Sequence, residues 1–449
     1  MTQTPGRSRS SVRAESTSID ISARDLTLDI ARVFCVVLVV VIHLLMVGVG
    51  VASDGELIVS RPLENQTWFA AATWVGQIMP LFFVVGGFAS LTAWRSLQRR
   101  GGGAAQYVRN RVLRLAQPAL PLFLFYVVVI GVARFVIGVD PALLDTVVAG
   151  AGFPLWFLAA YTLCQALVPF MAGWHGRAPR RTLLVLLAAV ILVDTLRFST
   201  GVTEIGLLNL GFVWLLAQQF GFWYADGWFA ARNGWQLFAI AAGSYAVLYL
   251  VIGVFKAPYS WDMLANLNPA TLPLVLLALA QACVLRAMRP WLAWLMTTHA
   301  ARAVVFLVGT RLMTIYLWHL PLIIALSGVA LLIPGASPEP GTGAWWATRP
   351  ILFVVVFAAL FGLSFLVARY EAPREIGPTP PIGIVALGAV LTFVPAFAVL
   401  QWFLDFPLAV LGAVSFSIAI LLLGRWKAPR GTRPPMAPEL PTSADHSTP

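Results

Sequence analysis

A histidine and an arginine stand on one face of the first long apolar segment of this chain. Arg32 and His43 are eleven positions apart in the stretch LDIARVFCVVLVVVIH. In a helix they fall within about 20° of the same face and ~16 Å apart along the axis. An ionisable side chain deep in an apolar helix is costly unless it faces a polar cavity or a partner, which favours a functional His43. The alternative is a neutral histidine hydrogen-bonded between packed helices.

Asp29 is an acidic residue close in sequence to this pair, and it is a possible partner for either side chain. It precedes Arg32 by three residues, a spacing at which the two side chains can form an ion pair on a helix. It precedes His43 by fourteen residues, or ~21 Å of helix, and so cannot orient the imidazole. The partner of His43 is therefore expected on another helix.

Six arginines lie between the second and third apolar segments. Cytoplasmic loops of membrane proteins are enriched in such residues, which accounts for part of this density. Arg111 and Arg114 are stronger candidates for a binding site, because they stand three apart on one helical face where the third segment begins. Forked guanidinium groups in that position can bind phosphates. Gly101–Gly103 fit a flexible connection, since no GK[ST] follows them.

A second polar cluster is expected in the stretch GTRLMTIYLWHLPL. It places Arg311, Tyr316 and His319 within the membrane or near its outer face. These three side chains predict a polar cavity, and an interfacial aromatic belt explains the tyrosine equally well. Other polar residues need no special role. His175 and His299 are predicted in solvated cytoplasmic loops, and Asp194 with Arg197 as a surface pair.

Several common kinds of site have no support in the sequence. There is no GxSxG, no HExxH and no close pair of carboxylates within an apolar segment. The three cysteines all lie in apolar segments and show no zinc-binding spacing. We therefore expect no metal and no tightly bound cofactor.

Composition identifies the elements that must position these residues. The 449 residues are 59% hydrophobic and 11% charged, and the mean hydropathy is +0.83. Apolar segments of about 20 residues recur, each long enough to cross the bilayer as a helix. We predict an all-α, polytopic transmembrane bundle of about twelve spans, with ten core helices and two more at the C-terminus. The spans are 29–50, 70–94, 116–137, 153–172, 182–198, 206–224, 236–255, 271–287, 303–333, 351–369, 380–403 and 406–424. The segment 303–333 is longer than one span needs.

The distribution of lysine and arginine predicts the orientation of the bundle. Basic loops such as RSLQRRGGGAAQYVRNRVLR fall on one side and acidic loops such as DGELIVSRPLEN on the other. The positive-inside rule then places both termini in the cytoplasm of an integral plasma-membrane protein. The formal net charge of +11 lies mostly at the inner surface, where anionic lipids or a polyanionic cosubstrate would meet it. Because the charge is spread over short loops, a nucleic-acid partner is not expected.

Four regions follow from these patterns. Residues 1–25 and 425–449 are polar and are predicted as disordered cytoplasmic tails. Residues 26–370 form the membrane-embedded domain that carries the candidate site, and 371–424 add two helices. No internal repeat is evident, which weakens the case for a transporter built from duplicated halves.

Taken in order, five segments resemble the acyltransferase 3 family of membrane O-acyltransferases, especially its actinobacterial forms. The first segment has Asp29, Arg32 and His43 at the family's spacing, and the resemblance extends over roughly 25 to 370. The other four segments are MPLFFVVGGFAS (79–90), RNRVLRLAQP (109–118), PLWFLAAY (154–161) and IYLWHLPL (315–322). One departure is Gly86, which stands where the family usually has a serine.

The resemblance implies an enzyme that transfers an acyl group, usually acetyl, from cytoplasmic acyl-CoA to a hydroxyl. The acceptor would be a glycan, a lipid-linked glycan or another envelope-associated molecule. Arg111, Arg114 and Arg32 would bind the phosphates of acyl-CoA, whose pantetheine arm spans roughly 15 Å, close to the rise from Arg32 to His43. His43 would act as general base or carry the acyl group transiently. The leading alternative is a transporter or flippase in which His43 and Arg311 relay protons or bind substrate.

Overall fold

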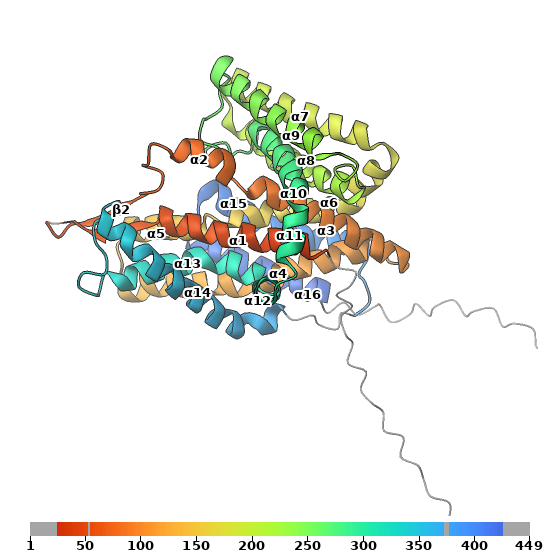
Figure 1. The fold of residues 1–449 in the computed structure, drawn as a ribbon. Coiled ribbons are helices and arrows are strands. Elements are labelled where there is room, and N and C mark those ends of the chain that lie inside the picture. Colours follow the sequence, from red (N-terminus) through yellow and green to blue (C-terminus); the bar gives the residue numbers. More distant parts are fainter. Residues whose placement is uncertain (1–24, 53, 372–376, 425–449) are drawn as a thin grey trace, which may run out of the picture.

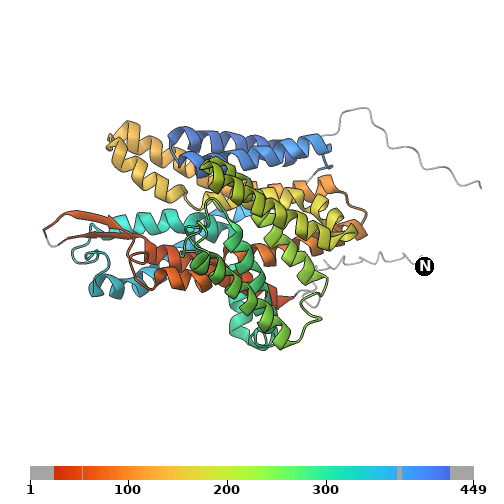
Figure 2. The ribbon, with the colours of Figure 1, turned by 90° about the horizontal axis from the view of Figure 1, so that it is seen from above.

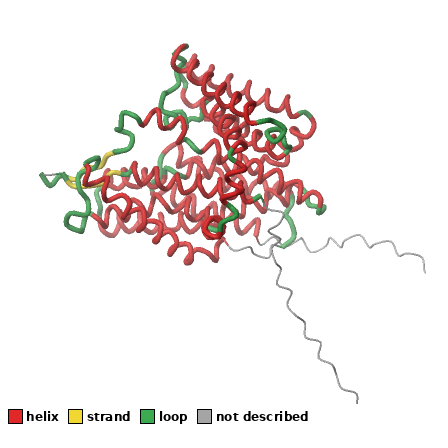
Figure 3. Tube along the Cα trace, in the orientation of Figure 1, coloured by secondary structure: helices red, strands yellow, loops and turns green. Residues whose placement is uncertain are grey.

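The computed structural model describes residues 25–52, 54–371 and 377–424. Within these ranges the chain is mainly helical, with connecting loops and a short two-stranded hairpin at one end of the bundle (Figures 1 and 3). The two predicted tails lie outside the described residues, except for Asp25. This residue caps the first helix, since its carboxylate accepts a hydrogen bond from the Thr27 amide.

Long helices make up the body of the bundle. They are α1 (Leu26–Met46), α3 (Met79–Arg99), α4 (Ala104–Gly131), α6 (Leu155–Arg177), α7 (Pro179–Thr200), α8 (Asn209–Ala225), α9 (Gly234–Tyr249), α10 (Leu272–Ala287), α13 (Leu312–Ala330), α14 (Gly343–Glu371), α15 (Ile382–Trp402) and α16 (Phe406–Gly424). Shorter elements connect them. They are the antiparallel strands β1 (Gly48–Val51) and β2 (Leu57–Ser60), the helices α2 (Phe69–Gly76), α5 (Pro141–Gly152), α11 (Arg289–Leu295) and α12 (His299–Gly309), a 3₁₀ turn (Thr203–Leu208) and two π-helical turns (Val132–Ile137, Leu250–Val254).

The predicted all-α membrane bundle is confirmed. Among the described residues, eleven helices are long and apolar enough to span a bilayer. The pair α10 and α11, bent by 56° at its junction, supplies a twelfth. If that pair is one span, the count of twelve agrees with the predicted even number, and the orientation of the bundle stays a prediction.

Helices α1 and α13 lie side by side and run in the same direction. A Cβ on Gly309, the last residue of α12, would lie 3.9 Å from Val33 of α1. Ten residues after each of these two positions, the rings of His319 and His43 are in contact. The predicted span 303–333 is therefore two helices, α12 and α13. Arg311 lies at their junction, level with the first half of α1 and away from the end of the bundle where His43 and His319 meet.

Helices α3 and α8 approach each other most closely at two glycines. A Cβ on Gly221 would lie 2.0 Å from the Val84 carbonyl oxygen, and one on Gly87 would lie 2.3 Å from that of Gln218. Small residues permit such backbone contact between membrane helices. The close contact with α8 therefore explains why a glycine stands at position 87, in the GGF segment.

Helices α15 and α16 lie side by side at one edge of the bundle (Figure 2), where α16 packs against α4 and α15 packs against α6 and α4. Phe416 of α16 stacks on Phe123 of α4, with ring centroids 5.0 Å apart. The buried Arg109 donates hydrogen bonds to the carbonyls of Leu423 and Gly377, both at 2.7 Å. One of the six loop arginines is thereby committed to holding α16 on α4.

Candidate active site

Two histidines from different helices meet near one end of the bundle. His43, in the last turn of α1, faces His319 of α13, with ring centroids 5.0 Å apart and an interplanar angle of 59°. His319 is completely buried, whereas His43 keeps some accessible surface. His43 is therefore the member of the pair that a substrate can reach.

Backbone carbonyls orient both imidazoles. Nδ1 of His43 lies 2.9 Å from the Val39 oxygen, and Nδ1 of His319 lies 2.5 Å from the Tyr316 oxygen. A carbonyl only accepts hydrogen bonds, so each Nδ1 carries a hydrogen, and in the neutral tautomer each Nε2 presents a lone pair. Nε2 of His319 is buried and has no hydrogen-bond partner among the described residues. The expectation that another helix orients His43 is wrong: its own helix does so, four residues back.

Tyr316 connects this pair to the start of α6. Its hydroxyl donates to the Pro154 carbonyl at 2.9 Å, and its ring lies 4.6 Å from that of Phe157. The preceding residue, Phe153, places its ring 6.5 Å from that of His43. The YLWH and PLWF segments, far apart in sequence, thus build one wall around the imidazole.

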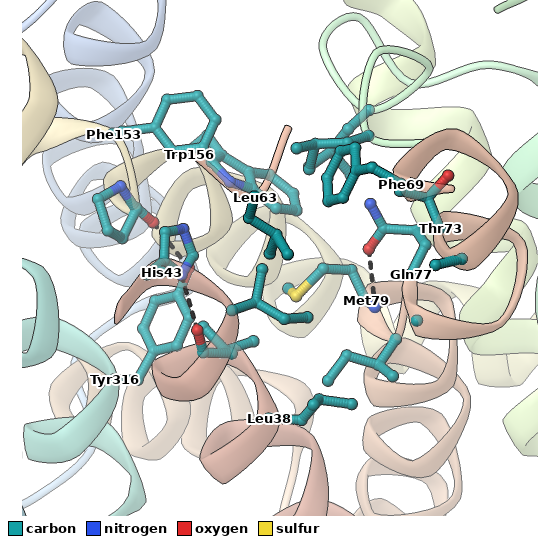
Figure 4. A pocket seen from close by; sticks show the side chains of 18 of the residues that line it. Leu38, His43, Leu63, Phe69, Thr73, Gln77, Met79, Phe153, Trp156 and Tyr316 are labelled. Atoms are coloured by element: carbon teal, nitrogen blue, oxygen red, sulfur yellow. Dashed lines mark hydrogen bonds between the residues drawn. The ribbon is translucent and has the colours of Figure 1, made fainter. Parts of the chain in front are cut away.

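An apolar pocket of about 210 Å³ adjoins His43. Figure 4 shows His43 and Tyr316 on one side, with Phe69, Thr73 and Gln77 of the α2 region across from them. No charged side chain lines this pocket. Its wall is completed by residues from the loop before α10 and from the first turn of α6.

The two candidate phosphate-binding arginines lie on α4, away from this pocket. The Arg111 guanidinium is 5.2 Å from the centroid of the Tyr107 ring, and Arg114 is exposed. Tyr107 in turn donates hydrogen bonds to Gln165 of α6, at 3.2 Å, and to the Ser90 carbonyl, at 3.3 Å. Arg111 is thereby anchored beside the junction of α3, α4 and α6.

The remaining predicted residues are separated from the histidine pair. Arg32 forms an ion pair with Asp29 at 3.7 Å, and its Nε is buried without a hydrogen-bond partner. The Arg311 guanidinium lies over the exposed ring of Phe365 and donates to the Leu307 carbonyl. Of the expected cluster of Arg311, Tyr316 and His319, only the last two reach His43.

A comparison with known protein families bears directly on this arrangement. The sequence profile described as an acyltransferase domain, of the acyltransferase 3 family, matches residues 25–369. This chain belongs to the acyltransferase 3 family. The matched range begins just before α1 and ends within α14, so it contains both histidines and leaves α15 and α16 outside. Searches of curated proteins and of solved structures found no match.

This acyltransferase 3 protein has Gly86 where the family usually has a serine. The structure shows which group lies where the serine side chain would project. A Cβ on Gly86 would lie 3.3 Å from Cε2 and 3.5 Å from the hydroxyl oxygen of Tyr161. Tyr161 stacks on Phe157, with ring centroids 5.2 Å apart. A tyrosine hydroxyl from α6 therefore lies where a serine side chain on α3 would project.

Sequence reasoning missed a buried polar cluster at the opposite end of α6 from Pro154. His175 was expected in a solvated loop but is buried, with its ring nitrogens 2.9 Å from Gln219 Oε1 and from Asp226 Oδ2. Asp226 also pairs with Arg95 of α3. Burial raises the pKa of Asp226, but the hydrogen bonds from Arg95 and His175 outweigh this and hold its pKa below the usual value. This cluster ties together the ends of α3, α6 and α8.

Asp194 was likewise predicted at the surface, and it is buried. Its carboxylate accepts hydrogen bonds from Asn209, Tyr259 and the Leu272 amide, at 2.8 to 3.0 Å. All three partners come from other elements, so spacing within α7 could not reveal them. Among the described residues, no three His, Cys, Asp or Glu side chains lie together in a way that could hold a metal ion.

Proposed function

We propose that this acyltransferase takes an acyl group, typically acetyl, from cytoplasmic acyl-CoA and transfers it to a hydroxyl. The acceptor is a glycan, a glycolipid or another envelope-associated molecule. One observation carries the proposal: His43, with Nδ1 held by a carbonyl and Nε2 available as a base, lies in the wall of a pocket within the matched domain. That is the arrangement a general base for a hydroxyl requires.

The proposed chemistry needs one base and one leaving group. Nε2 of His43 removes the proton from the acceptor hydroxyl while its oxygen attacks the thioester carbonyl carbon. The carbon–sulfur bond then breaks, an ester is released, and the CoA thiolate takes up a proton. A second route forms an acyl group on His43 Nε2 first, which the acceptor oxygen then removes. Trapping acyl-histidine in protein given only acyl-CoA would distinguish the second route from the first.

The proposed donor path has consistent dimensions along two helices. Pro154, bonded by Tyr316, and Gln165, bonded by Tyr107, are eleven residues apart on α6, or ~16 Å. The rise from Arg32 to His43 on α1 is the same. A pantetheine arm of roughly 15 Å matches both. Phosphates near Arg111 would thus leave the thioester close to the histidine pair.

The direct test is acyl transfer by the full-length protein in vesicles supplied with labelled acetyl-CoA and a total lipid extract of bacterial membranes. We expect label to enter an ester that mild alkali releases, only when the protein is present. A transporter or flippase would instead move substrate across the vesicle without any acyl donor. Protein-dependent transport with no protein-dependent labelling would overturn the proposal.

We further expect Arg111→Ala and Arg114→Ala to weaken donor binding. Loss of one charge-assisted contact to phosphate, worth about 1.5–3 kcal/mol, would raise the KM for acetyl-CoA about tenfold or more with little change in kcat. Steady-state kinetics at varied acetyl-CoA measures both constants. Arg180→Ala is the matched control, because Arg180 is an exposed arginine at the start of α7. Unchanged KM in both α4 variants would remove these arginines from the donor site.

A further inference from the structure

The pocket beside His43 is the place where the acceptor hydroxyl must lie. A general base has to be within hydrogen-bond reach of the proton that it removes. His43 contributes to the wall of this pocket, whereas the fully buried His319 does not. The lining of the pocket therefore reports on the chemistry of the acceptor.

The three side-chain oxygens that line the pocket, on Thr73, Gln77 and Tyr316, are already engaged in hydrogen bonds. The Thr73 hydroxyl donates to the Ala70 carbonyl and accepts from the Met263 amide. Gln77 Oε1 accepts from the Met79 amide, and the Tyr316 hydroxyl donates to Pro154. A sugar ring would bring several hydroxyls into this space, and each one left without a partner costs about 1–3 kcal/mol.

Apolar side chains make up the rest of the wall and the rim. Leu38, Phe69, Leu264 and Trp156 line the pocket, and Trp68 and Phe153 at its edge are 55% and 39% exposed. On a membrane helix bundle, exposed aromatic groups beside an opening are typical of a surface that meets lipid. An apolar body that enters here gains about 25 cal/mol for each Å² that it buries.

We infer that the acceptor is an amphiphile whose reacting hydroxyl is carried on a hydrocarbon segment, and that this segment occupies the pocket beside His43. The inference rests on the proposed function and narrows its acceptor class from glycans in general to lipid-like alcohols. The volume of about 210 Å³ is below the roughly 300–1,000 Å³ of sites that enclose a drug-sized ligand. Only the hydroxyl-bearing end of the acceptor enters, and the remainder stays outside.

Gly76 offers a way to fill the pocket without disturbing the fold. It lines the pocket, and a Cβ there would meet nothing within 4 Å. Gly76→Leu therefore places a side chain in open space. Gly243→Leu is the matched control, because Gly243 is an exposed glycine of α9 that also has open space around it.

The experiment uses the full-length protein in vesicles, labelled acetyl-CoA, and the primary alcohols from ethanol to octanol, with glycerol and methyl glucoside as polar acceptors. We expect kcat/KM to rise about fourfold per added methylene, corresponding to about 0.8 kcal/mol, until the pocket is full. Glycerol and methyl glucoside should be poor acceptors. Gly76→Leu should shorten the preferred alcohol by several carbons, and Gly243→Leu should not change it.

Three results would overturn the inference. Preference for methyl glucoside over hexanol, with transfer still dependent on His43, would leave the proposed function standing and exclude an apolar acceptor. A Gly76→Leu effect on the preferred acyl-CoA length, with no effect on alcohol length, would assign the pocket to the acyl chain. Absence of His43-dependent transfer to any acceptor, including the lipid extract, would reject the proposed function together with the inference.

Discussion

Replacing His43 by alanine should lower kcat for acyl transfer by about 10²- to 10⁴-fold, the usual contribution of a general base. The imidazole is oriented by the Val39 carbonyl and reaches the pocket through its other edge. Alanine removes the base and leaves the helix intact. His43→Gln, which keeps a polar side chain but cannot take up a proton, should be nearly as inactive. Labelled ester formed per minute at saturating acetyl-CoA measures the effect.

The control for this experiment is His299→Ala. His299 is an exposed histidine at the first residue of α12 and has no place in the proposed chemistry. It should retain full activity. All three variants should insert into the membrane and melt at the same temperature as the unchanged protein. Activity of His43→Ala within a few-fold of the unchanged protein would show that another group acts as the base.

The membrane architecture was predictable because it depends on local information. Apolar segments long enough to span the bilayer are visible in composition alone. The predicted span 303–333 was wrong at the short interruption 309–312, where α12 ends and α13 begins. The GGF segment was singled out only by the resemblance, and the sequence did not reveal its close contact with another helix. The partner in this contact, Gly221, lies more than a hundred residues away on α8.

The candidate site was predictable residue by residue but not as an arrangement. Periodicity placed His43 on a defined face of α1, and the resemblance singled out His319, but nothing in one sequence could show that the two rings touch. The sequence could not identify the group that orients His43, because that group is a backbone carbonyl, which every residue carries. His175 and Asp194 were misjudged for a related reason. Each was expected near a helix end, in contact with solvent, yet each is buried against polar partners from other elements of the chain.

His319→Phe should lower kcat by about 10²-fold while leaving the KM for acetyl-CoA unchanged. His319 does not line the pocket, so it acts on the reaction through His43. Phenylalanine fills the same space but removes the hydrogen bond to the Tyr316 carbonyl and the buried Nε2 lone pair. Small displacements of a catalytic group are enough for losses of this size.

A conservative variant separates positioning from simple packing. His319→Gln keeps an acceptor oxygen near the place of Nε2, so it should recover at least tenfold of the lost kcat, although glutamine fills the space less well than phenylalanine. If His319 only filled space, the order would reverse, with phenylalanine active and glutamine impaired. If His319 instead helped to bind the donor, both variants would raise the KM for acetyl-CoA. The thioester would then no longer fit beside the histidines, even with the phosphates bound at the arginines of α4. Melting temperatures within a few degrees of the unchanged protein are required for either variant to count. Recovery by glutamine but not by phenylalanine would then identify the lone pair beside His43 as the feature that the reaction uses.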